Sequence, residues 1–147
     1  MDNRRSNVGA IVALVICAAI PVACAGSDDD AEELVPDEGP WSSVAERPCP
    51  KGSFLHWENF GEPFVRSWCT GCHSSQLTEE RREEAPVDVN LDSLEGIREH
   101  MDRMWTRAAD QNATMPPAGG PGEEERALLG EWLACGAPSR TDLDAWE

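Results

Sequence analysis

The chain has 147 residues, enough for one ordinary domain once a targeting segment is removed. Its 12 basic and 28 acidic residues give a net charge of −16, so it repels the phosphates of nucleic acids and anionic lipid headgroups rather than binding them. An apolar fraction of 40%, with six Trp and three Phe, supports a small core and excludes a wholly disordered chain.

The first segment has the layout of a bacterial secretory signal. Arg4 and Arg5 precede an apolar run at residues 8–25 that holds no charged side chain. We therefore expect residues 1–23 to be a signal peptide and the protein to be exported. The run is about as long as the shortest membrane spans, so its retention as an anchor is the alternative.

The end of this segment is similar to the processing site of bacterial lipoproteins. Residues 21–24 read Pro-Val-Ala-Cys, and in such sites the Cys receives a lipid and becomes the new N-terminus. The resemblance predicts lipidation of Cys24 and attachment to the periplasmic face of a membrane. Ala25 stands where an Asp retains lipoproteins at the inner membrane of some bacteria, which favours the outer membrane. Since Ala23 and Ala25 also form a small-x-small pattern, ordinary cleavage after Ala25 stays open.

An acidic segment follows the signal. Without its signal peptide the chain loses two Arg and one Asp, and the remaining 10 basic and 27 acidic residues give a net charge of −17. Residues 26–40 are rich in Asp and Glu, contain two Pro and have few apolar side chains. We therefore expect a solvated tether at residues 24–47 and the folded domain at residues 48–147.

The six Cys fall into three groups. Two belong to the signal segment or its end, and two belong to a motif within residues 69–73. The remaining pair, Cys49 and Cys135, is most simply a disulfide, because exported chains fold in an oxidising compartment. The alternative is a pair of unrelated buried thiols.

Residues 69–73 read Cys-Thr-Gly-Cys-His, the pattern that attaches c-type haem. Two thiols separated by two residues can add to the two vinyl groups of haem, and the following His then reaches the iron from the same side. We therefore predict one haem c, bound covalently by Cys69 and Cys72, with His73 as the proximal iron ligand. A zinc site would require a second Cys/His pair, and a thioredoxin-like dithiol would require a βαβ pattern, neither of which is visible in the sequence.

The sequence around this motif resembles the class I cytochrome c family. Gly61 stands eight residues before the first haem Cys, where this family has a Gly, and Leu129, Trp132 and Leu133 reproduce its C-terminal Leu-x-x-aromatic-Leu pattern. The resemblance covers residues 55–138. It implies an all-α fold in which three to four helices wrap around one haem, which supplies much of the core. It also implies a contact between Gly61 and Trp132.

Helical periodicity agrees with this fold class. Apolar residues recur three and four positions apart over residues 93–109, which predicts one amphipathic helix there. A last helix is expected from Glu123, where three Glu suit the positive end of a helix, to Gly136. No stretch alternates convincingly as a strand.

The second axial ligand is predicted from loop chemistry and the resemblance together. Met115 lies in a Pro- and Gly-rich loop just before the last helix, and cytochromes c similarly offer an axial Met from that place. Pro116 and Pro117 stiffen the loop, so less entropy is lost when the Met sulfur binds iron. The other candidates are less well placed. Met101 and Met104 are expected to pack in the core, His100 to lie off the apolar stripe, and His56 to precede the first helix.

Further contacts are implied by the resemblance. In the family a Pro about a dozen residues after the motif supplies the carbonyl that orients the proximal His, and Pro86 is so placed. Four side chains of the helix at residues 93–109 are candidates to contact the haem propionates: Arg98, Arg103, Trp105 and Arg107. For the three Arg residues, the alternative is that they are simply solvated at the surface.

Together these features predict a membrane-tethered monohaem cytochrome that carries single electrons between periplasmic redox proteins. His/Met ligation raises the reduction potential and leaves no open coordination position, so neither catalysis nor a small-molecule substrate is expected. The net charge predicts redox partners with a basic docking patch and no nucleic acid. Two alternatives stay open: a haem enzyme or gas sensor with an exchangeable sixth ligand, and a structural lipoprotein whose motif is inert.

Overall fold

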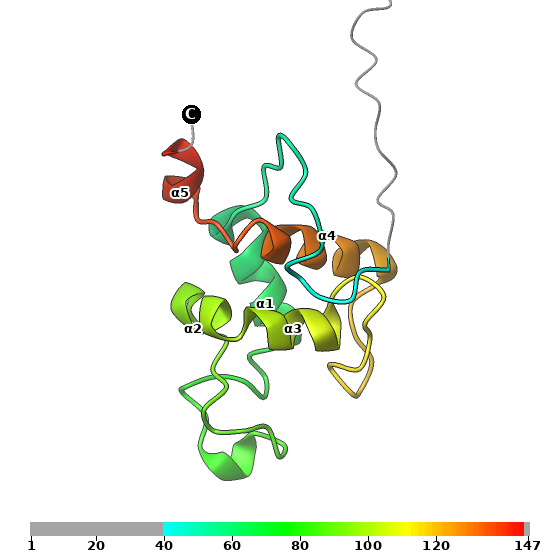
Figure 1. Ribbon diagram of the computed structural model, residues 1–147. Helices are drawn as coiled ribbons and strands as arrows, with labels where there is room; N and C mark the ends of the chain where they lie inside the picture. The colour runs from blue at the N-terminus through cyan, green and yellow to red at the C-terminus, as the bar shows by residue number, and fades with distance from the viewer. Residues whose placement is uncertain (1–39, 146–147) are drawn as a thin grey trace, which may run out of the picture. The chain divides into compact units, whose positions relative to one another are not determined.

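The structure is a computed structural model that describes residues 40–145. These residues form five α-helices, a π-helix and a short 3-10 helix, with no strand among them (Figure 1). The described residues therefore agree with the predicted all-α fold class. Within this range no helix is long and apolar enough to cross a bilayer. The predicted signal peptide, Cys24 and the tether before residue 40 lie outside the described residues.

The first helical segment leads directly into the Cys-x-x-Cys-His motif. His56 precedes the π-helix η1 (Trp57–Gly61), and its backbone N–H donates to Oδ1 of Asn59 at 2.8 Å. Helix α1 (Glu62–Trp68) continues from η1 without a loop. Because α1 ends immediately before Cys69, the orientation of this helix determines where the motif lies.

The middle of the chain departs from the single helix predicted over residues 93–109. The structure has two helices, α2 (Leu94–Glu99) and α3 (Met101–Ala108), separated at His100. The backbone of His100 leaves the helical conformation (φ −110°, ψ 19°), and its Nε2 lies 3.0 Å from the carbonyl oxygen of Asp88 in the preceding loop. Both helices still bury their apolar stripes in one core, so the sequence periodicity runs through the break and does not reveal it.

The predicted last helix is confirmed. Helix α4 (Glu123–Ala134) has three Glu in its first turn, where carboxylates stabilise the positive end of a helix. It ends before Gly136, whose φ of 83° is the left-handed conformation that glycine tolerates. The sequence did not predict the short helix α5 (Arg140–Asp144) that follows, capped by the Ser139 side chain.

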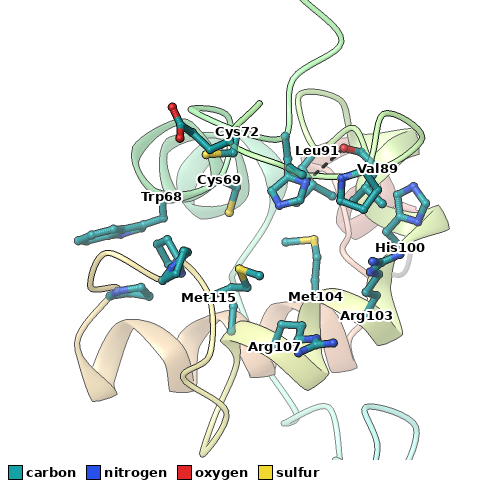
Figure 2. Close-up of a pocket in the computed structure, with 18 of the residues that line it drawn as sticks. Trp68, Cys69, Cys72, Val89, Leu91, His100, Arg103, Met104, Arg107 and Met115 are labelled. Carbon is teal, nitrogen blue, oxygen red and sulfur yellow. Dashed lines mark hydrogen bonds between the residues drawn. The ribbon is translucent and has the colours of Figure 1, made fainter. Parts of the chain in front are cut away.

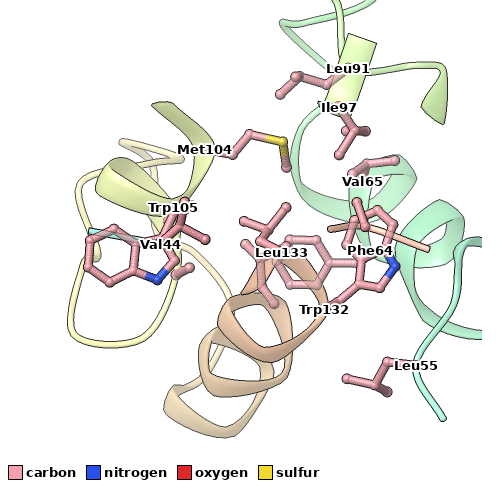
Figure 3. Packing of buried hydrophobic residues seen from close by; sticks show 14 of the residues in the cluster. Val44, Leu55, Phe64, Val65, Leu91, Ile97, Met104, Trp105, Trp132 and Leu133 are labelled. Atoms are coloured by element: carbon pink, nitrogen blue, oxygen red, sulfur yellow. The ribbon is translucent and has the colours of Figure 1, made fainter. Parts of the chain in front are cut away.

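The core is built around Trp132 of α4, whose side chain has no exposed surface (Figure 3). Its ring centroid lies 6.2 Å from that of Trp57 and 6.1 Å from that of Phe60, and its Nε1–H donates to the carbonyl of Pro138 at 3.2 Å. Gly61 lies so close that a Cβ placed there would overlap the ring. The predicted contact between Gly61 and Trp132 is thus confirmed.

We expect Gly61→Ala to lower the free energy of unfolding by about 1–3 kcal/mol, the usual cost of forcing extra volume into a packed core. The new methyl group would overlap the Trp132 ring, which is fully buried. Gly71→Ala is the matched control, because nothing lies within 4 Å of a Cβ placed there. Urea unfolding compares the two variants, and equal stabilities would contradict the close approach.

Residues 41–47 pack on the domain, so the folded chain begins before the predicted boundary at residue 48. Val44 is buried in the core, and Arg47 is only 4% exposed. The Arg47 guanidinium donates to both carboxylate oxygens of Asp110 at 3.0 Å and lies 4.8 Å from the centroid of the Trp41 ring. Trp41, Val44 and Ala45 among polar neighbours give little periodic signal. The buried Arg47 is stabilised by a carboxylate distant in sequence.

A disulfide joins Cys49 to Cys135, the pair that the cysteine count leaves over. Their Cα atoms lie 4.8 Å apart, although 86 positions separate the residues in sequence. Close by, the Ser53 hydroxyl donates to Oε1 of Glu131 at 2.6 Å. The chain that precedes η1 is therefore attached to the C-terminal half of α4.

Candidate functional site

The Cys-Thr-Gly-Cys-His motif forms a compact turn at the end of α1. The Cys69 N–H donates to the carbonyl of Val65 at 2.8 Å, continuing the helical pattern. The Cys69 carbonyl in turn accepts from the N–H groups of Cys72 and His73, at 3.2 and 2.9 Å. These backbone bonds fix the relative positions of the three side chains that the motif contributes.

A cavity of about 410 Å³ brings the predicted site residues together (Figure 2). Cys69, Cys72 and His73 line it together with Met115 and Pro86. Its size falls within the roughly 300–1,000 Å³ typical of cofactor and ligand pockets. Most of the remaining wall is apolar: Phe64, Trp68, Val89, Leu91, Met104 and Ala108.

His73 is oriented by a backbone carbonyl, but not by the one predicted. Its Nδ1 lies 3.4 Å from the carbonyl oxygen of Val89, the contact dashed in Figure 2. Because a carbonyl can only accept, Nδ1 carries the ring proton and Nε2 keeps a lone pair for a metal. The Pro86 carbonyl was predicted for this role, but the contact of His73 is with Val89, and the Pro86 oxygen accepts from Arg82 at 2.8 Å.

The electrostatic surroundings favour the neutral form of His73. Burial lowers its pKa below the ordinary value and outweighs the hydrogen bond to Val89, which acts in the opposite direction. The nearby positive charges of Arg82 and Arg103 lower the pKa further. A neutral imidazole is the form that binds a metal ion.

The thiol of Cys69 is not poised for redox chemistry. Burial raises its pKa to about 12, so the thiol stays protonated at neutral pH. Reactive dithiols need the opposite, a pKa lowered by a helix N-terminus or a nearby cation. Cys69 follows the C-terminus of α1, where the helix dipole disfavours a thiolate. These surroundings do not fit a thioredoxin-like redox pair.

No group of three or more His, Cys, Asp or Glu side chains within residues 40–145 is arranged to hold a metal ion.

Two methionines lie across the cavity from the cysteines (Figure 2). Met115 belongs to the loop between α3 and α4 and is 39% exposed, whereas Met104 belongs to α3 and is 6% exposed. Met104 was predicted to pack in the core, and it does so while also lining the cavity. Met101 packs against the core and is not part of the cavity lining.

The Met115 loop is attached to α3 at its start and again near its middle. The N–H groups of Thr114 and Met115 donate to the carbonyl of Arg107 at 2.9 and 3.0 Å. At the start of the loop, the carboxylate of Asp110 accepts from Nε1 of Trp105 at 2.7 Å, and it also pairs with Arg47. These bonds place the Met115 side chain against the cavity although the loop itself is exposed.

Asp110 also connects the loop to α4. Its backbone N–H donates to the carbonyl of Arg126 at 2.9 Å. A Cβ at Gly130 would overlap the Asp110 carboxylate, so glycine at this position allows the acid to lie against the helix. Asp110 therefore holds the loop, α3 and α4 in one arrangement.

Three basic side chains line the cavity: His100, Arg103 and Arg107. Both Arg residues are among the candidates for carboxylate contacts. His100, predicted to lie off the apolar stripe, is not part of the core cluster; it lies at the break between α2 and α3 and lines the cavity. A carboxylate-bearing cofactor would find positive charge from the two Arg side chains, while Glu83 and Glu84 add negative charge elsewhere in the lining.

The other candidates lie elsewhere. Arg98 donates to the carbonyl of Ala137 at 3.0 Å and to Oδ2 of Asp142 at 2.6 Å, so it is not a cavity residue. The indole of Trp105 is bonded to Asp110, as described above. His56 is buried at the start of η1 and is outside the cavity lining, as predicted for a residue that precedes the first helix.

The chain that follows the motif is fixed by Asp92. Its Oδ2 accepts from the Ser74 hydroxyl at 2.7 Å and from the Ser75 N–H at 2.8 Å. Although burial acts to raise the pKa of Asp92, these hydrogen bonds lower it overall, so the group remains a carboxylate. Next to it, the Leu91 N–H donates to the carbonyl of His73 at 2.8 Å.

The sequence did not reveal the role of Arg82, which is 2% exposed in the loop between the motif and α2. This loop includes the 3-10 helix η2 (Glu79–Arg81). Arg82 follows an exposed Arg81 and precedes two exposed Glu residues, so it reads as part of a solvated charged run. Only the folding of the loop around its side chain distinguishes Arg82 from its solvent-exposed neighbours.

Comparisons of the chain with protein-family models, with curated proteins and with solved structures found no match in any of the three. The function is therefore inferred from the geometry of this chain's own residues.

Proposed function

We propose that this protein is a monohaem c-type cytochrome that carries one electron at a time. The observation that carries the proposal is the cavity, which has the attachment motif on one side and a Met side chain from a separate loop across from it (Figure 2). The donor set fits the group: two thiols, a neutral imidazole with a free Nε2, a thioether, and an apolar wall with cations at one side.

The residues have distinct roles in this proposal. Cys69 and Cys72 would hold haem c covalently, and Nε2 of His73 and the sulfur of Met115 would bind its iron; all four residues line the cavity. When bound, haem would supply a one-electron ferrous/ferric couple. The Val89 carbonyl keeps the proton on Nδ1 of His73, which fixes the ring orientation.

A haem enzyme or gas sensor is the second candidate. The observation that favours it is the 39% exposure of Met115, which belongs to a loop rather than to the packed core. A ligand on such a loop could exchange with a small molecule, whereas an electron carrier keeps it bound. The Met115 substitution discussed below distinguishes the two functions.

The proposed cellular location of this cytochrome is outside the cytoplasm. The Cys49–Cys135 disulfide supports this location, because such bonds persist in oxidising compartments. Lipidation at Cys24 would attach the domain to the periplasmic face of the membrane, with the outer membrane favoured. The net charge of −17 after removal of the signal would attract redox partners with a basic docking patch.

Mass spectrometry tests the cofactor directly. Protein produced in a host with haem-attachment machinery is expected to carry the mass of one haem, which survives acid-acetone extraction. Cys69→Ser combined with Cys72→Ser should abolish this covalent haem, whereas Thr70→Ala, between the two thiols, should retain it. Wild-type protein with two free thiols at these positions, or with zinc bound to them, would contradict the proposal.

A further inference from the structure

The loop between the motif and α2 contains a buried cation without a matching carboxylate. The Arg82 guanidinium donates to four oxygens at 2.7–2.9 Å, all of them carbonyl or amide oxygens: Ser74 O, Pro86 O, Val89 O and Asn90 Oδ1. None of the ion pairs found in the described part of the chain includes Arg82. Arg47, the other deeply buried Arg, is neutralised by Asp110.

One of these four oxygens is the one that orients His73. The Val89 carbonyl accepts from Nη2 of Arg82 at 2.7 Å and from Nδ1 of His73 at 3.4 Å. The shorter, charge-assisted bond goes to Arg82. An oxygen already polarised by a cation attracts the His73 proton less strongly, so the proton stays on Nδ1 and the imidazole is a weaker electron donor to a metal.

We propose that Arg82 is a positioning residue that raises the reduction potential of the haem site. The inference rests on the proposed function and adds to it a residue that does not touch the cofactor. Two effects act in the same direction. The buried positive charge favours the iron state with less positive charge, and the weakened hydrogen bond reduces the donation by His73 that stabilises the ferric state.

Arg82→Gln in the haem-containing protein tests the role. Gln can still donate to one or two of the carbonyls but carries no charge. We expect the equilibrium constant for one-electron reduction to fall about tenfold, which is a potential lower by about 59 mV. Arg81→Gln is the matched control, since it removes the same charge from an exposed neighbouring position where solvent screens it. Equal potentials of the two variants in a spectroelectrochemical titration would overturn the role.

Asn90→Asp tests the effect of the Arg82 charge on the reduction potential without removing Arg82. It therefore tests the proposal even if Arg82→Gln does not fold. The Asn90 side-chain oxygen already accepts from Arg82 at 2.9 Å, so an Asp of the same shape would neutralise the guanidinium in place. We expect a lower potential here as well, whereas Gln76→Glu, which adds the same charge at an exposed position of the loop, should leave it nearly unchanged. An Asn90→Asp potential equal to that of Gln76→Glu would overturn the proposal.

A structural signature separates this role from general damage to the loop. In the ferrous protein, the NMR resonance of the His73 Nδ1 proton should move downfield in Arg82→Gln, because the released Val89 carbonyl becomes a stronger acceptor. An unchanged resonance would overturn the hydrogen-bond part of the argument. Wild-type protein without haem would overturn the proposed function itself, whereas haem-containing variants with unchanged potentials would overturn only the role of Arg82.

Discussion

Met115→Ala is expected to convert a low-spin, six-coordinate haem into a mixed or high-spin one that binds added carbon monoxide or imidazole. The same change should lower the reduction potential, because a thioether ligand favours the ferrous state. Absorption spectra before and after addition of the ligands measure the first effect, and redox titration measures the second. If the wild-type protein already binds carbon monoxide at the iron as readily as the Met115→Ala variant, the sixth position is exchangeable and the sensor or enzyme function is favoured instead.

Met104→Ala is the matched control, because both Met side chains line the cavity but only Met104 is buried in the core. We expect its truncation to lower the free energy of unfolding by about 2–5 kcal/mol while the low-spin spectrum is kept. The reverse outcome would assign the axial sulfur to Met104. In that case the loop between α3 and α4 would have a structural role only.

Removal of the Cys49–Cys135 disulfide is expected to lower the free energy of unfolding by about 4–5 kcal/mol. The bond closes a loop across 86 positions, and the chain entropy it removes from the unfolded state grows with loop length. Cys49→Ser combined with Cys135→Ser, compared with wild type by urea unfolding, measures the effect.

Ser53→Ala is the control for this comparison. It removes the neighbouring 2.6 Å hydrogen bond to Glu131 and leaves the covalent link, so a loss of only about 1 kcal/mol is expected. Peptide mapping without reduction should recover the linked pair of cysteines. Alkylation of both thiols in the unreduced protein would contradict the disulfide.

The features that the sequence predicts well are those in which a residue type has one dominant physical reason. Gly61 is needed because a large ring lies against the backbone, and Gly136 because the chain turns there with a positive φ. The predicted contact with Trp132 and the end of α4 depend on these two residues. The spacing of Cys69, Cys72 and His73 likewise follows from local chemistry, since all three reach one cavity from a single turn.

Other features depend on partners that sequence patterns do not identify. The carbonyl that orients His73 belongs to Val89 rather than Pro86, and a main-chain oxygen leaves no mark in the residue types. Arg82 looks like its exposed neighbour Arg81 until the loop folds around it. The break at His100 preserves the apolar stripe, so periodicity alone predicts one helix where there are two.

The attachments of the N-terminal segment act in series when the chain is under mechanical load. A pull at residue 40 reaches Trp41 first, whose carbonyl accepts from Gln111, and then Arg47, whose ion pair transmits the force to Asp110 and α4. It next reaches Cys49, where a covalent bond passes the force to the end of α4. Little tension therefore enters α1 and the turn at residues 69–73, because the attachments that precede them in the chain carry the load. A cytochrome held at a membrane by its N-terminus would keep the geometry around His73, and with it a constant reduction potential, while the tether is stretched.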